Sequence, residues 1–307
     1  MAGVAYRLRI PEPHTHLVEV VLSVDDVHGP AEVVMPAWTP GSYLMREYPR
    51  NVVDFVAVDG ARRPLPFTKT DKNTWRVEAP ADGTLHVRVI VNADELTVRT
   101  SHVDASHASI VGASVFPFLA GREREPLVLG VEAPAGWRVT TALAEGEAPH
   151  TYHAADYDEL ADSPLELGTH QLVEWEIEGR RHRWAVWGRG NYDLQRLAAD
   201  ATRIVLAERA LFGSLPYPDY TFFLNLAPAG GGGLEHRNCC SLMADRWSFR
   251  GPAYEGFLAL VAHELFHAWN GKRLRPRALA RLSYTREAYT RDLWVVEGLT
   301  TYYNDLL

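Results

Sequence analysis

Short runs of β-branched and aromatic residues, broken by glycine, proline and aspartate, fill the first half of the sequence. Runs such as 17–24 (LVEVVLSV) and 85–93 (LHVRVIVNA) alternate apolar and polar residues with a period near two, which is the pattern of a strand with one buried face. No long stretch with helical spacing interrupts these runs. Residues 1–168 are therefore predicted to form an all-β, sandwich-like domain.

After residue 168 the spacing of the apolar residues changes. The predicted elements follow one another as a strand at 182–188, a helix at 194–213, a strand at 220–227, a helix from Tyr254 to Asn270 and a helix from about Asp292. A second domain that mixes strands and helices is therefore predicted over residues 169–307. Its last helix is still running at Leu307 without a capping glycine or proline, so we expect the chain to be truncated within this domain.

Charge and the lack of long apolar segments argue against two classes of function. The 307-residue chain has a formal net charge of -8, whereas a surface for nucleic acid or acidic lipid needs a basic face. No apolar run approaches the ~20 residues of a membrane helix, and no signal peptide is recognisable. The only cysteines, Cys239 and Cys240, are adjacent and poorly placed to bridge each other. A cytoplasmic protein without nucleic-acid or membrane partners is expected, and the oligomeric state stays open.

One motif points to metal chemistry. Residues 263–267 read HELFH, the HExxH pattern. Histidines four residues apart lie on one face of a helix, here opposite its apolar side chains, so His263 and His267 can hold one zinc ion. Glu264 lies about 100° further round the helix, beside the metal, and is predicted to be the general base that activates water.

A catalytic zinc needs a third protein ligand and one open position. Glu297 follows in a segment whose apolar residues predict a mostly buried helix, where an unpaired carboxylate is costly. We therefore predict Glu297 as the third ligand, with Glu287 and Asp292 as fallback ligands. The alternative is that Glu297 pairs with one of the arginines of 272–291, a stretch that is otherwise typical of a solvated loop.

Two further groups are predicted near the metal. On the helix of Glu297, the hydroxyl of Thr300 or Thr301 is expected to orient a ligand, and Thr301 is the residue that we assign to this second shell. In the glycine-rich segment 230–238, the GK[ST] of a phosphate loop is missing, and the glycines either form a flexible turn or let an extended substrate lie along a strand edge.

In the second reading of that segment, Gly232 and Gly233 bind the substrate backbone and Glu235 meets a charged end. A carboxylate beside a catalytic zinc favours substrates with a free α-amino group. Glu235 therefore argues for an aminopeptidase rather than an endopeptidase.

Several segments together resemble a known family, the glycyl aminopeptidases that combine a β-rich N-terminal domain, a thermolysin-like catalytic domain and a C-terminal PDZ domain. The resemblance covers most of the chain and rests on the segments 35–52, 156–168, 232–236 (GGLEH), 263–276 (HELFHAWNGKRLRP) and 294–303 (WVVEGLTTYY). It implies a thermolysin-like zincin fold of the HExxH-plus-glutamate type for residues 169–307. It also implies zinc bound by His263, His267 and Glu297, catalysis through Glu264, and removal of N-terminal glycine or alanine from peptides.

The chain departs from that family pattern after Leu307, because no further helical lobe and no PDZ domain follow. Related enzymes place the tyrosine or histidine that steadies the oxyanion in that later region. Tyr302 and Tyr303 are possible substitutes, although packing aromatics are the simpler interpretation. Two other functions stay open: a binding module or inactive fragment that keeps a zinc site, and a thermolysin-like endopeptidase.

Overall fold

The computed structural model describes residues 3–280 and 283–306 of the chain. Contacts between residues divide it into two units. Unit 1 comprises Met1–Gly168 together with Tyr284–Glu287, and unit 2 comprises Thr169–Ser283 together with Ala288–Leu307. The predicted division assigned all residues after 168 to one domain, whereas the short segment Tyr284–Glu287 packs with unit 1. Each unit has its own hydrophobic core.

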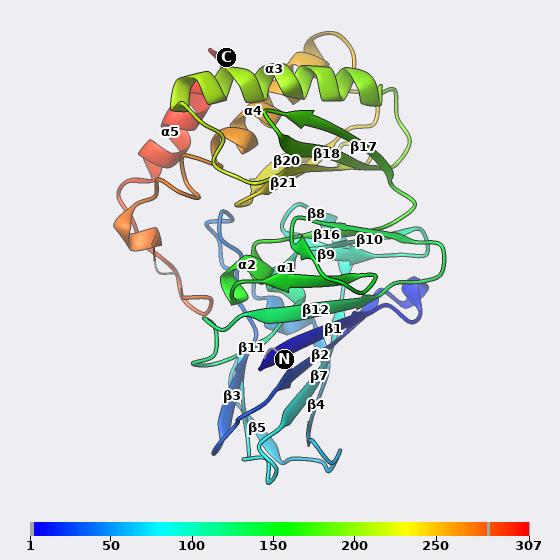
Figure 1. The fold of residues 1–307 in the computed structure, drawn as a ribbon, viewed down its shortest axis with the longest axis vertical. Coiled ribbons are helices and arrows are strands. Elements are labelled where there is room, and N and C mark those ends of the chain that lie inside the picture. The colour runs from blue at the N-terminus through cyan, green and yellow to red at the C-terminus, as the bar shows by residue number, and fades with distance from the viewer. Residues whose placement is uncertain (1–2, 281–282, 307) are drawn as a thin grey trace. The chain divides into compact units, whose positions relative to one another are not determined.

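Unit 1 is built mainly from three sheets (Figure 1). The seven-stranded sheet has the order β14 (Ala144–Glu145), β15 (Thr151–Ala154), β12 (Leu127–Glu132), β1 (Val4–Arg9), β2 (Leu17–Val24), β7 (Leu85–Asn92) and β4 (Val52–Asp59). The five-stranded sheet has the order β13 (Arg138–Thr141), β16 (Leu165–Gly168), β10 (His107–Ile110), β9 (Thr100–Val103) and β8 (Asp94–Thr97). The four-stranded sheet has the order β11 (Phe118–Leu119), β3 (Ala31–Val34), β6 (Thr74–Val77) and β5 (Phe67–Asp71).

The prediction of a mostly β N-terminal region is confirmed, but its details differ in two ways. There are three sheets rather than the two of a simple sandwich, and unit 1 also holds the short helices α1 (Gly112–Val115) and α2 (Tyr157–Ala161) and the turns η1 (Pro13–Thr15) and η2 (Tyr48–Asn51). Helices of one turn are too short to show a helical period. For α2, the N-terminal cap is the feature of the sequence that could have indicated a helix. The Asp156 carboxylate accepts a hydrogen bond from the Glu159 amide, and the Glu159 carboxylate accepts one from the Ala155 amide.

Unit 2 contains one five-stranded mixed sheet and three longer helices. The sheet has the order β17 (Gln171–Ile177), β18 (Arg180–Trp187), β19 (Tyr220–Leu226), β21 (Cys239–Ala244) and β20 (Gly231–Glu235). The helices are α3 (Leu194–Phe212), α4 (Gly251–Phe266) and α5 (Leu293–Asn304), and one further turn is η3 (Arg277–Leu279). Helices α3 and α4 pack side by side against the sheet (Figure 1), and α5 packs on α4.

The predicted helix over 194–213 is confirmed, and its ends have clear local causes. The Asp193 side chain caps the first turn by accepting from the amide of Arg196, and Gly213 ends the helix with a φ of 87°. Helix α4 begins at Gly251, three residues earlier than predicted, because Pro252 occupies a first-turn position that needs no amide donor. It ends at Phe266 rather than Asn270, so that His267 is its C-terminal cap.

Two smaller predictions also have an outcome. Cys239 and Cys240 are not joined in a disulfide and are both buried in β21, as expected from their adjacency. Among the residues that the structure describes, no helix is both long and apolar enough to span a membrane.

Candidate metal centre

Three side chains from α4 and α5 converge on one point of unit 2. The Nε2 atoms of His263 and His267 are 3.1 Å apart. The Oε2 atom of Glu297 lies 3.4 Å from Nε2 of His263 and 3.6 Å from Nε2 of His267. The three residues that the sequence predicted as ligands are thus brought together, and each offers a ligand atom.

The spacing of these atoms fits a zinc ion. Zinc binds imidazole nitrogen and carboxylate oxygen at about 2.0–2.1 Å, so two ligand atoms on a tetrahedral ion lie about 3.3 Å apart. The observed separations are 3.1, 3.4 and 3.6 Å. A point about 2.0 Å from all three atoms exists. The donor set of two imidazoles and one carboxylate is also one that catalytic zinc uses.

Both imidazoles are oriented through their second nitrogen. Nδ1 of His267 lies 2.8 Å from the carbonyl oxygen of Asn270, and Nδ1 of His263 lies 3.4 Å from Oδ1 of Asn304. A hydrogen on Nδ1 leaves the lone pair on Nε2 for a metal. The sequence analysis missed both asparagines, because a carbonyl partner carries no residue-type signal and Asn304 lies 41 residues away from His263.

For the hydroxyl that was predicted to orient a ligand, the structure favours Thr300 over Thr301, the residue to which the sequence assigned it. Thr301 is exposed, whereas Thr300 is fully buried. Oγ1 of Thr300 lies 3.2 Å from Nδ2 of Asn270, the residue whose carbonyl faces His267. Thr300 and Thr301 are both within a turn of Glu297, and only the packing of α5 against α4 selects Thr300.

A second group of side chains lies beside the metal cluster. Single ligand atoms of Glu235, Glu264 and His267 lie within 4.8 Å of one another, and all three residues are buried. Residues 231, 233 and 235 share one face of strand β20 because side chains alternate along a strand, and α4 packs against β20. The strand therefore carries Glu235 to the same place as Glu264.

Gly233 and Glu264 are in close contact. A Cβ atom built on Gly233 would lie only 2.1 Å from Oε1 of Glu264. The carboxylate of the predicted base thus occupies the space that a side chain at position 233 would need. Gly232, the other predicted substrate contact, has a φ of 110°, a conformation that glycine adopts without strain.

The electrostatics of the cluster favour a cation. Burial alone would lower the pKa of His267, but the hydrogen bond with Glu297 and the charges of the surrounding carboxylates outweigh burial and raise that pKa to about 9. The same field that holds a proton on the imidazole would stabilise a metal ion, which binds in place of that proton.

Helix α5 is less buried than its apolar residues predicted. Val296 and Thr300 are its buried residues, whereas Trp294 is 69% exposed and Leu306, just beyond the helix, 61%. The prediction of a mostly buried helix was wrong because the apolar positions are spread around the helix and one face packs on α4. The side chain of Glu297 is 35% exposed, and its ion pairs with the two histidines favour the ligand hypothesis over an arginine partner.

The remaining predicted candidates lie outside the cluster. Asp292 is exposed and precedes α5, and Glu287 is exposed and belongs to unit 1. Tyr302 is 59% exposed, and Tyr303 stacks on Phe266 with ring centroids 5.3 Å apart. Packing is therefore the simpler role for Tyr303.

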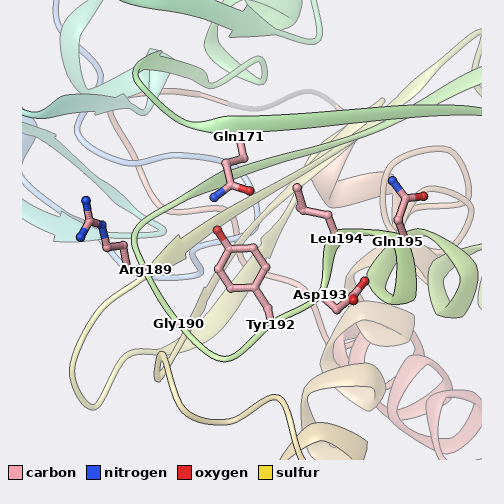
Figure 2. Close-up of a pocket in the computed structure, with 7 residues that line it drawn as sticks. All are labelled: Gln171, Arg189, Gly190, Tyr192, Asp193, Leu194 and Gln195. Atoms are coloured by element: carbon pink, nitrogen blue, oxygen red, sulfur yellow. The ribbon is translucent and has the colours of Figure 1, made fainter.

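A separate open pocket of about 540 Å³ lies at the start of α3 (Figure 2). Figure 2 shows the hydroxyl of Tyr192 facing the side chain of Gln171, while Arg189 extends away from both. None of the residues that line this pocket belongs to the metal cluster. The pocket is therefore separate from the predicted metal ligands.

Two family models match the chain. Residues 5–169 match the Peptidase M61 N-terminal domain, and residues 256–307 match the M61 glycyl aminopeptidase family. None of the curated proteins that were compared matches the chain.

Solved structures extend the likeness. An aminopeptidase N family protein from Idiomarina loihiensis is 31% identical with a TM-score of 0.94, and the match covers 98% of this chain and 54% of that protein. An M1 zinc metallopeptidase from Deinococcus radiodurans is 16% identical with a TM-score of 0.55, and the match covers 98% of this chain and 68% of that one. A variant of it, described as bound to a Tyr-Ser-Ala substrate, is 14% identical with a TM-score of 0.56 and the same coverage.

These similarities do not all support the same conclusion. The two M1 structures show a shared fold alone, and the chain spans about half the length of the Idiomarina protein. The N-terminal family model, in contrast, matches more than half of the chain. The chain belongs to the M61 peptidase family.

Proposed function

We propose that this chain carries the centre of a zinc aminopeptidase that removes single residues from the N-terminus of peptides. The observation that carries the proposal is the convergence of the two histidines of α4 with Glu297, with the carboxylates of Glu235 and Glu264 beside them. His263, His267 and Glu297 would hold the zinc. When bound in such a site, zinc acts as a Lewis acid that polarises a carbonyl group and makes water more acidic.

Glu264 is the residue that would move protons. It is buried next to His267 but is not part of the three-ligand triangle, which suits a base beside the metal. In the proposed reaction its carboxylate takes a proton from the attacking water and passes it to the leaving amine. Its carboxylate lies in the space that a side chain at position 233 would need, so that glycine at this position leaves the base where it is.

Glu235 and strand β20 would bind the substrate. β20 is at the edge of its sheet, so one side of its backbone can pair with an extended peptide, including at Gly232 and Gly233. Glu235 ends this strand and is 6% exposed. A buried carboxylate there would accept hydrogen bonds from the α-ammonium group of the substrate, which favours an aminopeptidase over an endopeptidase.

The preference for N-terminal glycine or alanine rests on the family rather than on a pocket of this chain. The family model that matches residues 256–307 is that of glycyl aminopeptidases. The expected partners are therefore short peptides with a free N-terminus and a small first residue.

A pair of substrates tests the role of Glu235. The chain is given a glycyl peptide with a free N-terminus and the same peptide with an acetylated N-terminus. We expect cleavage of the free peptide only, because the acetylated one cannot offer an ammonium group. Equal rates on both peptides would favour an endopeptidase and remove this role of Glu235.

The Glu264→Gln variant tests the base. The amide keeps the size of the side chain but cannot take a proton, so turnover should fall by roughly 10²–10⁴-fold while the zinc content stays that of the wild-type chain. Zinc is measured by elemental analysis of the same samples used for the assay. An active variant would refute the role of Glu264, and zinc without turnover in the wild-type chain would favour a non-catalytic, metal-binding module.

A further inference from the structure

A second cluster of metal-binding residue types lies in unit 1, where the proposed function assigns nothing. His102 is in β9, His107 begins β10, and Asp104 lies in the turn that joins these strands. One possible ligand atom of each residue lies within 4.8 Å of those of the others. Three residues of one hairpin, with the sequence spacing H-x-D-x-x-H, thus meet at one point.

The distances in this cluster suit ligands of a metal better than charge-assisted hydrogen bonds. Nε2 of His102 lies 3.4 Å from Oδ2 of Asp104, and Nδ1 of His107 lies 3.4 Å from Oδ1 of Asp104. A hydrogen bond between imidazolium and carboxylate has a length of about 2.7–2.9 Å, whereas two ligand atoms on a tetrahedral zinc ion lie about 3.3 Å apart. In the first cluster both histidines lie near one oxygen of Glu297, at 3.4 and 3.6 Å, whereas here each histidine lies near a different oxygen of Asp104, and the contact of His107 is a long hydrogen bond.

His102 is poorly satisfied by the protein alone. Its Nδ1 atom is buried, and no described residue forms a hydrogen bond with it. Its other nitrogen faces the carboxylate of Asp104 at the long distance given above. A cation between Nε2 and the carboxylate would bind the nitrogen that has only this long contact, and it would leave the surroundings of Nδ1 unchanged.

Asp104 is held in place by three hydrogen bonds to one of its carboxylate oxygens. Its Oδ1 atom accepts from the amide of Ser106 at 2.7 Å, from the hydroxyl of Ser106 at 2.6 Å and from the amide of His107 at 3.0 Å. Oδ2 is then turned toward His102 as an oriented anionic ligand.

We propose that His102, Asp104 and His107 form a second metal site, which takes a divalent transition-metal ion such as zinc and joins β9 to β10. Two imidazoles and one carboxylate are a donor set for such ions rather than for magnesium or calcium, which bind through oxygen. The proposal is independent of the proposed peptidase activity, because no residue is shared between the two clusters.

His16 and Asp94 lie next to this site but have partners of their own. Nδ1 of His16 lies 2.5 Å from the carbonyl oxygen of Val103 and 3.4 Å from Oδ1 of Asp94. The rings of His16 and His102 are 6.3 Å apart between centroids. His16 and Asp94 are therefore not counted among the proposed ligands.

Metal counting on the full chain tests the proposal. Metal-free protein is loaded with zinc in the presence of a weak chelator, passed through a desalting column and analysed for zinc per chain. The wild-type chain should retain two ions and His102→Ala should retain one. The double variant His263→Ala/Glu297→Ala should also retain one, and the combination of all three substitutions none.

Two further variants guard against misfolding and against chance binding. Asp104→Asn keeps the Oδ1 acceptor of the turn but loses the negative charge, so it should lose the same ion as His102→Ala with an unchanged circular dichroism spectrum. His153→Ala replaces an exposed histidine of unit 1 outside the cluster and should retain both ions.

The possible outcomes separate this proposal from the proposed function. The second site would be overturned if the double variant retained no ion, or if the wild-type chain and His102→Ala retained equal amounts of zinc. His102, Asp104 and His107 would then form a hydrogen-bonded network without a metal. One ion in the wild-type chain and none in His102→Ala would instead support the second site and remove the first. Cobalt loading gives an independent check, because coordination by imidazole changes the visible spectrum of the ion.

Discussion

At Gly233 the missing side chain leaves room for the carboxylate of Glu264. In Gly233→Ala, the added Cβ would lie 2.1 Å from Oε1 of Glu264, so that the carboxylate must move. We expect kcat to fall about 10²-fold, the usual cost of a misplacement of ~1 Å, with zinc content unchanged. Steady-state kinetics and elemental analysis check this.

Gly231→Ala is the matched control for this prediction. Gly231 is on the same strand face, and a Cβ atom there meets nothing within 4 Å. Its kcat should stay close to that of the wild-type chain. If both variants lose activity equally, the effect comes from the strand as a whole and not from the contact with Glu264.

Glu208, on the buried face of α3, gives a prediction about stability. It is 0% exposed, and no described residue forms a hydrogen bond with either carboxylate oxygen. Burial raises the pKa of Glu208 well above its ordinary value, so the folded chain keeps it protonated. In the unfolded chain Glu208 releases its proton above pH ~4.3. Between that pH and the pKa of Glu208 in the folded chain, the free energy of unfolding therefore falls as pH rises, by up to ~1.4 kcal/mol per pH unit.

Glu208→Gln should remove this contribution. We expect the variant and the wild-type chain to be similarly stable near pH 4 and the variant to be more stable at pH 7, because glutamine has no proton to lose. Urea unfolding at a series of pH values measures the difference. A constant difference across that range would contradict the prediction.

At the scale of elements, the junction between α4 and α5 positions the predicted metal ligands relative to one another. Nδ2 of Asn270, just after α4, donates to the carbonyl oxygens of Val295 and Val296 at 3.0 Å each and to Oγ1 of Thr300 at 3.2 Å. The carbonyl of Asn270 faces His267. One residue thus ties the helix of Glu297 to the turn that follows His267, a predicted ligand.

Thr300→Val should weaken this junction. The methyl group fills the same volume but cannot hydrogen-bond, so we expect a loss of about 1–3 kcal/mol in the free energy of unfolding and ~10-fold weaker zinc binding. Thr301→Val, at an exposed position of the same turn, should change stability by less than ~0.5 kcal/mol. Equal effects of the two substitutions would contradict the role given to Thr300.

At the scale of the whole molecule, two separate cores predict a local response to zinc. In a chain with His102→Ala, only the first cluster can bind the ion, and it lies entirely within unit 2. Zinc at a hundredfold excess over its Kd should stabilise the site by ~2.7 kcal/mol. On adding zinc, we expect amide hydrogen exchange to slow in α4 and α5 and to stay unchanged in the seven-stranded sheet of unit 1. Adding His263→Ala to the same chain is the control, because it should remove the slowing. Equal slowing in both units would contradict separate cores.

Local patterns determined much of the fold before any tertiary contact was considered. The period-two runs, such as that of β2, predicted the mostly β character of unit 1, because a half-buried strand needs alternation. The spacing of the apolar residues in 194–213 predicted α3 closely. The four-residue spacing of His263 and His267 predicted their shared face, which the 3.1 Å separation of their Nε2 atoms confirms.

Only the tertiary structure decided which distant residues meet. It placed Glu297 at the histidines and selected Thr300 over Thr301. It also placed the carboxylate of Glu264 in the space left by the missing side chain of Gly233. The sequence predicted Glu297 as a ligand but could not show the contacts of Thr300 and Gly233, because these depend on how α4, α5 and β20 pack and not on the order of residues within any one element. Local spacing therefore determined which side chains share a face, and packing determined what each face touches.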